Sequence, residues 1–275
     1  MRLCLLLLSC LYVLLGSSAS QASEAVRPKV VSESSTQLRV GGVEYMLGHP
    51  SASFGEARTA DWKWQPLEKP NLGYQAEGAW LRFIIDSEAQ LPHTQYLQLN
   101  WPVLNRVEVR LFYPASNSWG PLMLAGDTVP MSSRPIADHR LVFPLNLQGE
   151  PQAAVYMHVQ SPELIALPLT ITDEASFDAG KIRDITLFSM FFGGMLVIVL
   201  YNASLLIFTR DLNYLLYLLY LLSAVFYTSI NTGFGQLFLW PDAPAFSQRF
   251  YGLSSALCFF TSVLFLSRFL EIARH

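Results

Sequence analysis

The sequence predicts an all-β sandwich followed by membrane-spanning α-helices. The 275 residues are 52% hydrophobic and 14% charged, whereas soluble domains carry about 25% charged residues. Only seven of the 39 charged side chains follow Asp184, although 91 residues lie there. Before Asp184, short alternating apolar and polar runs are separated by Gly, Pro, Asn and Ser, which is typical of strands and turns. This division excludes a single soluble globular protein, a disordered chain and a soluble cytoplasmic enzyme.

The first 22 residues have the features of a secretory signal peptide. Met1-Arg2 provides a short positive region, and residues 3–15 form an apolar run that is too short to span a bilayer. Ser20-Gln21-Ala22 places small residues at a cleavage site, so we expect signal peptidase to cut after Ala22. Residues 1–22 are therefore predicted to direct the following domain out of the cytoplasm.

Charge and cysteine content exclude two classes of function for the exported part. The formal net charge is −3, and no basic patch of the kind that nucleic-acid binders need is visible. Cys4 and Cys10 would leave with the signal peptide, and Cys258 lies in an apolar stretch. The exported domain then has no disulfide framework and no thiolate metal site, so its core alone must hold it together.

Residues 23–35 are polar and aperiodic, and we expect a flexible leader there. Residues 36–173 are predicted to form the sandwich, because no stretch in them shows a helical period. We favour a jelly-roll-like arrangement, since two stacked sheets can accommodate this many strands. The predicted strands are Gln37–Val40, Val43–Leu47, Ala79–Asp86, Gln95–Trp101, Arg106–Tyr113, Leu122–Leu124, Arg140–Leu147, Ala153–Gln160 and Leu167–Thr172.

Two of these strands carry more detailed predictions. In Arg106–Tyr113, apolar Val107, Val109 and Leu111 alternate with charged residues, which indicates one buried face. Pro144 lies inside an apolar run and cannot donate a ladder hydrogen bond, so its strand should be an edge strand or contain a bulge.

Three uncharged stretches follow the exported domain, and each is long enough to cross a membrane. With the sandwich outside, the first helix runs inward and the chain end lies in the cytoplasm. The predicted segments are helix one at 185–209, helix two at 212–234, an outer loop at 235–248, helix three at 249–268 and a cytoplasmic end at 269–275.

The connector between sandwich and membrane, residues 174–184, is expected to be a short helix. Glu174, Asp178 and Lys181 have helical i+4 and i+3 spacing, with Gly180 as a weak point. A stiff connector would pass motion from the sandwich to helix one, whereas a passive tether would not. Both readings stay open at this point.

Several motifs resemble those of a bacterial receptor family. Asn71-Leu72-Gly73-Tyr74 followed by Ala79-Trp80-Leu81-Arg82-Phe83 is similar to the signature of the type 2 extracellular domain of seven-transmembrane receptors with diverse intracellular signalling modules. Further matches in the same order are Pro102 to Val109, Gly126-Asp127, Arg134-Pro135 and Phe143-Pro144-Leu145, and in the membrane part Tyr201-Asn202, Tyr214 to Tyr217 and Gly233.

The resemblance implies the input half of a sensor in the bacterial inner membrane, with its N-terminal domain in the periplasm. It also implies structural roles for Gly73, Trp80, Arg82, Pro102, Tyr201 and Asn202. The family has seven helices, usually followed by a histidine kinase or diguanylate cyclase. Only three helices are present here, so we expect the chain to stop partway through a longer protein that forms homodimers through its membrane helices.

A carbohydrate-like ligand would need aromatic faces beside planar polar groups, and the family is thought to have a carbohydrate-binding-like fold. A periplasmic small molecule or glycan is therefore the expected partner, besides the lipid of the inner membrane. Trp119, in a polar turn, is the foremost candidate, whereas Trp80 and Trp101 lie at strand ends, where a core role is commoner. The candidate ligand-binding residues are Trp119, Trp101, Tyr113, Arg134, Arg140 and Asp127.

Other chemistry is less well supported by the sequence. The five histidines have no metal-site spacing, and no nucleophile elbow or phosphate loop is present, so we expect no enzyme activity in this chain. Calcium bound by Asp127 and Asp138 is an alternative to a site without cofactors. Arg82 should pair with an acid, and Asn202 should serve helix packing.

Two classes of function therefore remain. One is a receptor input half whose output domain lies outside this chain. The other is a non-signalling envelope protein, in which the sandwich is a binding or assembly module anchored by three helices.

Overall fold

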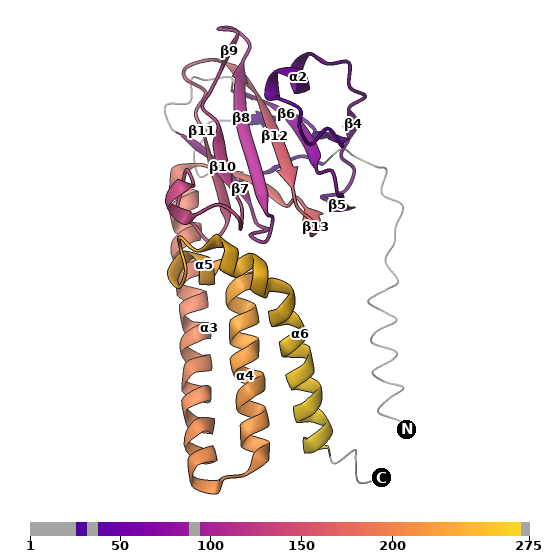
Figure 1. The fold of residues 1–275 in the computed structure, drawn as a ribbon. Coiled ribbons are helices and arrows are strands. Elements are labelled where there is room, and N and C mark those ends of the chain that lie inside the picture. Colours follow the sequence, from indigo (N-terminus) through magenta and orange to yellow (C-terminus); the bar gives the residue numbers. More distant parts are fainter. Residues whose placement is uncertain (1–25, 32–37, 88–93, 271–275) are drawn as a thin grey trace, which may run out of the picture.

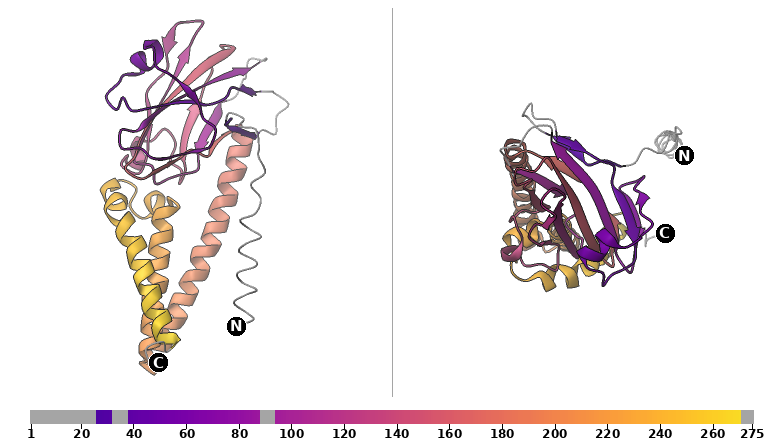
Figure 2. Two further views of the ribbon diagram at one scale, coloured as in Figure 1. Left: turned by 90° about the vertical axis from the view of Figure 1, so that its right-hand side faces the viewer. Right: turned by 90° about the horizontal axis from the view of Figure 1, so that it is seen from above.

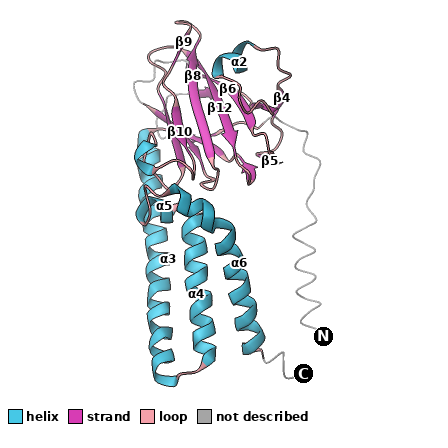
Figure 3. Cartoon of the chain, viewed as in Figure 1, coloured by secondary structure: helices cyan, strands magenta, loops and turns pink. Residues whose placement is uncertain are grey.

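A computed structural model describes residues 26–31, 38–87 and 94–270. A β-rich domain lies above three long helices, and these long helices follow the last strand along the chain (Figures 1 and 3). The predicted fold class is therefore confirmed. The predicted signal peptide, residues 1–22, lies outside the described residues.

The β domain contains two main sheets. The smaller has the strand order β1-β14-β7-β11, and the larger has the order β10-β8-β12-β6-β3-β4, with β2 and β9 pairing at β6 and β8. A short pair, β13 and β5, forms a third sheet. The strands are β1 (Lys29–Val31), β2 (Leu38–Val40), β3 (Glu44–Leu47), β4 (Gln65–Pro66), β5 (Asn71–Tyr74), β6 (Ala79–Ser87), β7 (Gln95–Leu99), β8 (Arg106–Tyr113), β9 (Ser118–Trp119), β10 (Met123–Ala125), β11 (Leu141–Leu145), β12 (Gln152–Gln160), β13 (Leu164–Ala166) and β14 (Leu169–Thr172).

The core lies between the two main sheets, as period-two alternation requires. The larger sheet contributes side chains such as Leu81, Val109 and Val155, and the smaller sheet contributes others such as Leu97 and Phe143; all of these are buried in one cluster. Strand β8 matches its predicted bounds, with Val107, Val109 and Leu111 facing the core. The prediction for Pro144 is also confirmed, because β11 is the outermost strand of the smaller sheet.

Two expectations for the N-terminal half are wrong. Residues 29–31 do not belong to a flexible leader, because β1 pairs in parallel with β14, from Lys29 opposite Thr170 to Val31 opposite Thr172. A helix also interrupts the strands: α2 (Phe54–Thr59) begins at a capping box formed by Ser53 and Glu56. Six residues are too few to show a helical period, so only the Ser-x-x-Glu spacing signals this helix.

Among the residues that the structure describes, three helices are long and apolar enough to span a bilayer: α3 (Glu174–Thr209), α4 (Leu212–Asn231) and α6 (Pro244–Phe269). The short helix α5 (Phe234–Phe238) begins at the last residue of the predicted helix two and continues into the predicted outer loop. In the left view of Figure 2, α3 separates from α4 and α6 near the sandwich.

The connector is part of one continuous helix. Asp173 caps α3 by accepting from the Ser176 backbone N–H at 2.9 Å, and the helix continues through Gly180 to Thr209. At about 1.5 Å per residue, α3 is longer than the roughly 30 Å apolar layer of a bilayer. Its first turns must therefore rise out of the membrane beside the sandwich.

Candidate functional site

The outer face of the larger sheet carries a layer of aromatic side chains. These face away from the core because they alternate with it along β6, β8 and β12. Trp80 is fully buried in this layer and stacks on His158 with ring centroids 4.3 Å apart. The buried and half-buried members of this aromatic layer are Phe54, Trp62, Trp64, Trp80, Phe112, Trp119 and Tyr156.

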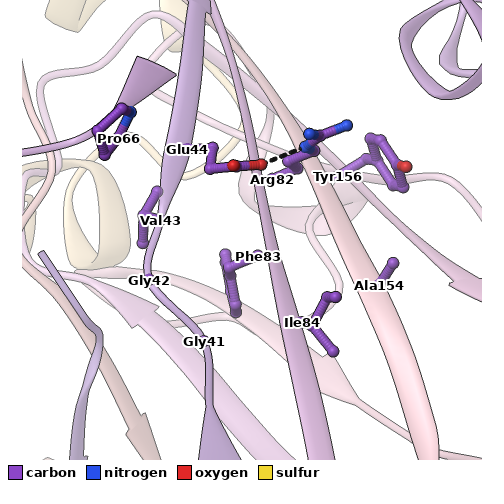
Figure 4. A pocket seen from close by; sticks show the side chains of 10 residues that line it. All are labelled: Gly41, Gly42, Val43, Glu44, Pro66, Arg82, Phe83, Ile84, Ala154 and Tyr156. Atoms are coloured by element: carbon purple, nitrogen blue, oxygen red, sulfur yellow. Dashed lines mark hydrogen bonds and ion pairs between the residues drawn. The ribbon is translucent and has the colours of Figure 1, made fainter. Parts of the chain in front are cut away.

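An outer pocket lies next to this layer and has a volume of about 440 Å³. Gly41 and Gly42 join β2 to β3 and have no side chains to fill the space beside Ile84, whose backbone oxygen accepts from the Gly41 N–H. Figure 4 shows Arg82 and Tyr156 side by side on one wall of the outer pocket. The lining residues are Gly41, Gly42, Val43, Glu44, Pro66, Arg82, Phe83, Ile84, Ala154 and Tyr156.

The polar groups of the outer pocket hold one another in place. Arg82 Nε donates to Glu44 Oε2 at 2.6 Å, which confirms the predicted pairing with an acid (Figure 4). The guanidinium of Arg82 also lies 4.3 Å from the ring centre of Trp64. Burial raises the pKa of Tyr156, so its phenol stays protonated and able to donate. An aromatic face, a guanidinium and a carboxylate thus border a half-open cavity.

A second cluster, the junction, lies where the sandwich meets the helices. Its first half surrounds the start of α3. Arg140 Nε donates to Asp138 Oδ1 at 2.9 Å, and Arg140 Nη1 lies 3.4 Å from Asp184 Oδ2 on α3. Burial alone would raise the pKa of Asp138, but His139 and Arg140 outweigh burial and hold that pKa well below its usual value. Phe177 of α3 stacks on Tyr96 of β7 with ring centroids 4.7 Å apart.

The second half of the junction joins the segment 126–134 to α5 and the turn after it. Arg134 Nη2 donates at 2.6 Å both to the Gly126 carbonyl and to Gln236 Oε1 of α5. Gln236 Nε2 in turn donates to the carbonyls of Asp127 and Val129. Both Arg134 and Gln236 are buried, so each depends on the other for its hydrogen bonds.

Three further contacts complete the junction. The Met131 N–H donates to the Pro241 carbonyl at 2.8 Å, and Ser132 Oγ donates to Asp242 Oδ1 at 2.8 Å. Gly233 has φ of 76° and lies so close to the sandwich that an added Cβ would be 2.2 Å from the His139 carbonyl oxygen. Backbone thus meets backbone across the junction.

The predicted ligand-binding residues do not lie together. Asp127, Arg134 and Arg140 belong to the junction, and Trp101 lines a cavity there with Arg140 and Asp184. The other two lie away from the junction. Trp119 is half-buried in the aromatic layer instead of exposed in its turn, and Tyr113 lies in the core, where its hydroxyl donates to the Asn146 carbonyl at 2.6 Å.

The residues matched by the family motifs have structural surroundings. Gly73 adopts a φ of 73°, Trp80 is buried, and Pro102 lies under Gly233. Asn202 is buried and donates to the Ile198 carbonyl of its own helix at 2.8 Å, whereas Tyr201 is largely exposed on α3.

Sequence reasoning missed Glu44, Tyr156 and Gln236 as functional candidates. Of these three, only Gln236 had a usable signal, since it is an amide within an otherwise apolar stretch. Among the residues that the structure describes, no three His, Cys, Asp or Glu side chains gather as a metal site would require. Calcium at Asp127 and Asp138 stays a prediction, although Asp138 is already engaged by Arg140.

Asp127 gives the junction a pH dependence that can be measured. Burial raises its pKa from 3.8 to about 7, even though Arg134 acts in the opposite direction. A raised pKa means that the folded state binds the proton more tightly, so this contribution to stability is complete below the unfolded-state pKa and is lost as pH rises through about 7. We expect Asp127→Asn to remove that loss.

The comparison requires thermal unfolding of both proteins at about pH 5 and about pH 8. The stability of the Asn variant relative to wild type should rise between these pH values by about 3 kcal/mol. The folded-state pKa of about 7 lies two units above pH 5, and each unit corresponds to about 1.4 kcal/mol. An unchanged difference between the two proteins would show that Asp127 titrates normally in the folded state.

Comparison with known families identifies both parts of the chain. A family model described as the type 2 extracellular domain of the seven-transmembrane receptors with diverse intracellular signalling matches residues 33–173. A second model, described as the seven-transmembrane module of the same group, matches residues 184–275. No curated protein matches the chain.

Proposed function

Because the chain belongs to the seven-transmembrane receptors with diverse intracellular signalling modules, we propose that it recognises a ligand in the outer pocket and transmits binding to the membrane helices through the junction. The family places a sensory extracellular domain before a membrane module. To this order of domains, the proposal adds the class of ligand, the site that binds it and the contacts that transmit binding to the helices. Its ligand is a small carbohydrate-like molecule or glycan in the bacterial periplasm, and its membrane is the inner membrane.

The observation that carries the proposal is the buried hydrogen-bond set of Arg134 and Gln236. If the sandwich separated from α5, both side chains would lose hydrogen bonds that they now make in a buried place. Leaving buried polar groups unsatisfied raises the free energy of the separated state. A binding module that is merely anchored would need no such contact. The sandwich also contacts α3 through Arg140 and Asp184, so the same domain contacts both α3 and α5. A change in the sandwich is therefore expected to alter how these helices pack.

The chemistry of the outer pocket supports a sugar-like ligand. Carbohydrate hydroxyls can donate to the Glu44 carboxylate and accept from Arg82 and Tyr156, while the neighbouring rings offer apolar faces. In this proposal, any kinase or cyclase activity belongs to a separate output domain. Association of two chains through their membrane helices would transmit the signal to it.

The test uses the chain in detergent, with a printed array of bacterial and host glycans as the probe. Arg82→Met should weaken binding of the retained glycan about tenfold or more, because a charge-assisted contact is lost. Arg106→Met is the matched control, since Arg106 forms a similar strand-surface pair with Glu108 outside the outer pocket. A fluorophore on Cys258 of α6 should respond to the glycan in wild type. Equal binding by wild type and Arg82→Met, or binding with no fluorophore response, would contradict the proposal.

A further inference from the structure

A second groove, separate from the outer pocket, lies between the smaller sheet and the first turns of α3. Its volume is about 510 Å³. Leu97, Leu99 and Ile171 of this sheet face the core, so alternation places the intervening polar side chains on the other face, towards α3. Thr170, Thr172 and Gln98 line the sheet side of this α3 groove.

The charged groups that line the α3 groove are all basic: Lys29, Arg140 and Arg183. Arg140 is already neutralised by Asp138 and Asp184. Arg183 Nε and Nη2 each donate to Asp184 Oδ1 at 3.3 Å, but 71% of the Arg183 side chain is exposed and can also meet a ligand. Lys29 is exposed and has no ion pair among the described residues. Two cations, one on the sandwich and one on α3, are therefore available to an anion.

Hydroxyl groups complete the lining. Thr172 Oγ1 accepts from Gln98 Nε2 at 2.6 Å, which leaves its own proton free to donate. Ser176 Oγ is buried and has no hydrogen-bond partner in the described part of the chain. Buried polar atoms are normally paired, so an unpaired hydroxyl in a basic groove indicates that a partner is missing.

We propose that the α3 groove binds a phosphate ester, held by Lys29 on the sheet side and Arg183 on the helix side. The oxygens of a tetrahedral phosphate group carry negative charge and accept several hydrogen bonds. A phosphate ester therefore suits two cations and neighbouring hydroxyls better than a neutral ligand does. The ester would bridge β1 and α3, and so strengthen the contact through which the sandwich holds this helix. This site is independent of the outer pocket and of its ligand.

Two sources of the phosphate ester fit the position of the groove. Arg183 lies two residues before Ile185, where the uncharged stretch begins, so the phosphoglycerol headgroup of a membrane lipid lies within its reach. A soluble periplasmic phosphate ester would enter from the open side. The same chemistry serves both, and the experiment separates them.

The chain is first reconstituted in nanodiscs of phosphatidylcholine and titrated with glycerol phosphate at fixed ionic strength, with calorimetry as the readout. Lys29→Ala combined with Arg183→Ala should weaken binding about tenfold or more, and Thr170→Val should cause a smaller loss without removing charge. The control is Lys63→Ala combined with Lys69→Ala, which removes two exposed cations outside the groove.

The titration is then repeated in nanodiscs that also contain phosphatidylglycerol. Unchanged binding supports a soluble ester as the natural ligand, and suppression of binding supports the lipid headgroup. The proposal is overturned if wild type binds no glycerol phosphate in phosphatidylcholine nanodiscs. It is equally overturned if the Lys29/Arg183 variant binds as tightly as the Lys63/Lys69 control.

Discussion

Replacing Gly233 by alanine should separate the sandwich from the membrane helices. The new Cβ would lie 2.2 Å from the His139 carbonyl oxygen and 3.0 Å from Pro102 Cβ. Neither neighbour can yield easily, because one is backbone and the other is a ring. The positive φ of 76° adds about 1–2 kcal/mol of backbone strain. Hydrogen exchange of segment 126–140 should therefore rise to the level of an undocked surface.

Gly73→Ala is the matched control for this substitution. Gly73 has a nearly equal φ of 73°, but nothing lies within 4 Å of the position of its added Cβ. It should show the backbone strain alone, with normal protection of segment 126–140. Equal exchange in the two variants would mean that the contact between Gly233 and His139 does not hold the junction together.

Replacing Arg134 by methionine should have the largest effect on stability of any single charge removal at the junction. The Gly126 carbonyl and Gln236 Oε1 would each lose a 2.6 Å donor, and Asp127 would lose the cation that opposes its raised pKa. Leaving a buried hydrogen-bonding group unsatisfied typically costs about 1–3 kcal/mol, and here two acceptors lose their donor. Thermal unfolding of the detergent-solubilised chain measures this loss.

A double-mutant cycle shows whether the cost arises at the junction. Gln236→Leu removes the acceptor on α5 and leaves the sandwich side intact. If Arg134 and Gln236 act as one unit, the double variant should lose less stability than the two single variants combined, by about 1–3 kcal/mol. Simple additivity would show that Arg134 stabilises only its own loop.

The sequence predicted the fold class because strand signals are local. Strand β8 alternates apolar and charged side chains over its whole length, and Pro144 alone shows that β11 is an edge strand. Strand β1 could not be predicted in this way, since its three residues pair with β14, which lies about 140 residues away. The jelly-roll order of connections also stays a prediction.

The candidate site was less predictable for a similar reason. The pairing of Arg82 with an acid followed from its place on a strand, although its partner Glu44 could not be named. The polarity of Asp127, Arg134 and Arg140 predicts ligand-binding residues, and the structure places all three in contact with the helices. Their role in ligand binding stays a prediction. Arg134 meets Gln236 across about 100 residues of sequence, and only tertiary docking brings the two together.

The central claim is that the sandwich is docked on the outer ends of the membrane helices. It is tested most directly by a disulfide across the junction, formed in membranes before solubilisation. Cysteines replace Ser132 and Asp242, because the Ser132 hydroxyl and the Asp242 carboxylate are 2.8 Å apart. Cys258→Ser removes the free cysteine of α6 from the same chain. Ser132→Cys with Asp211→Cys, at the opposite end of α4, is the control pair. The account predicts rapid cross-linking of the first pair alone under mild oxidation, and cross-linking of that pair no faster than the control would contradict it.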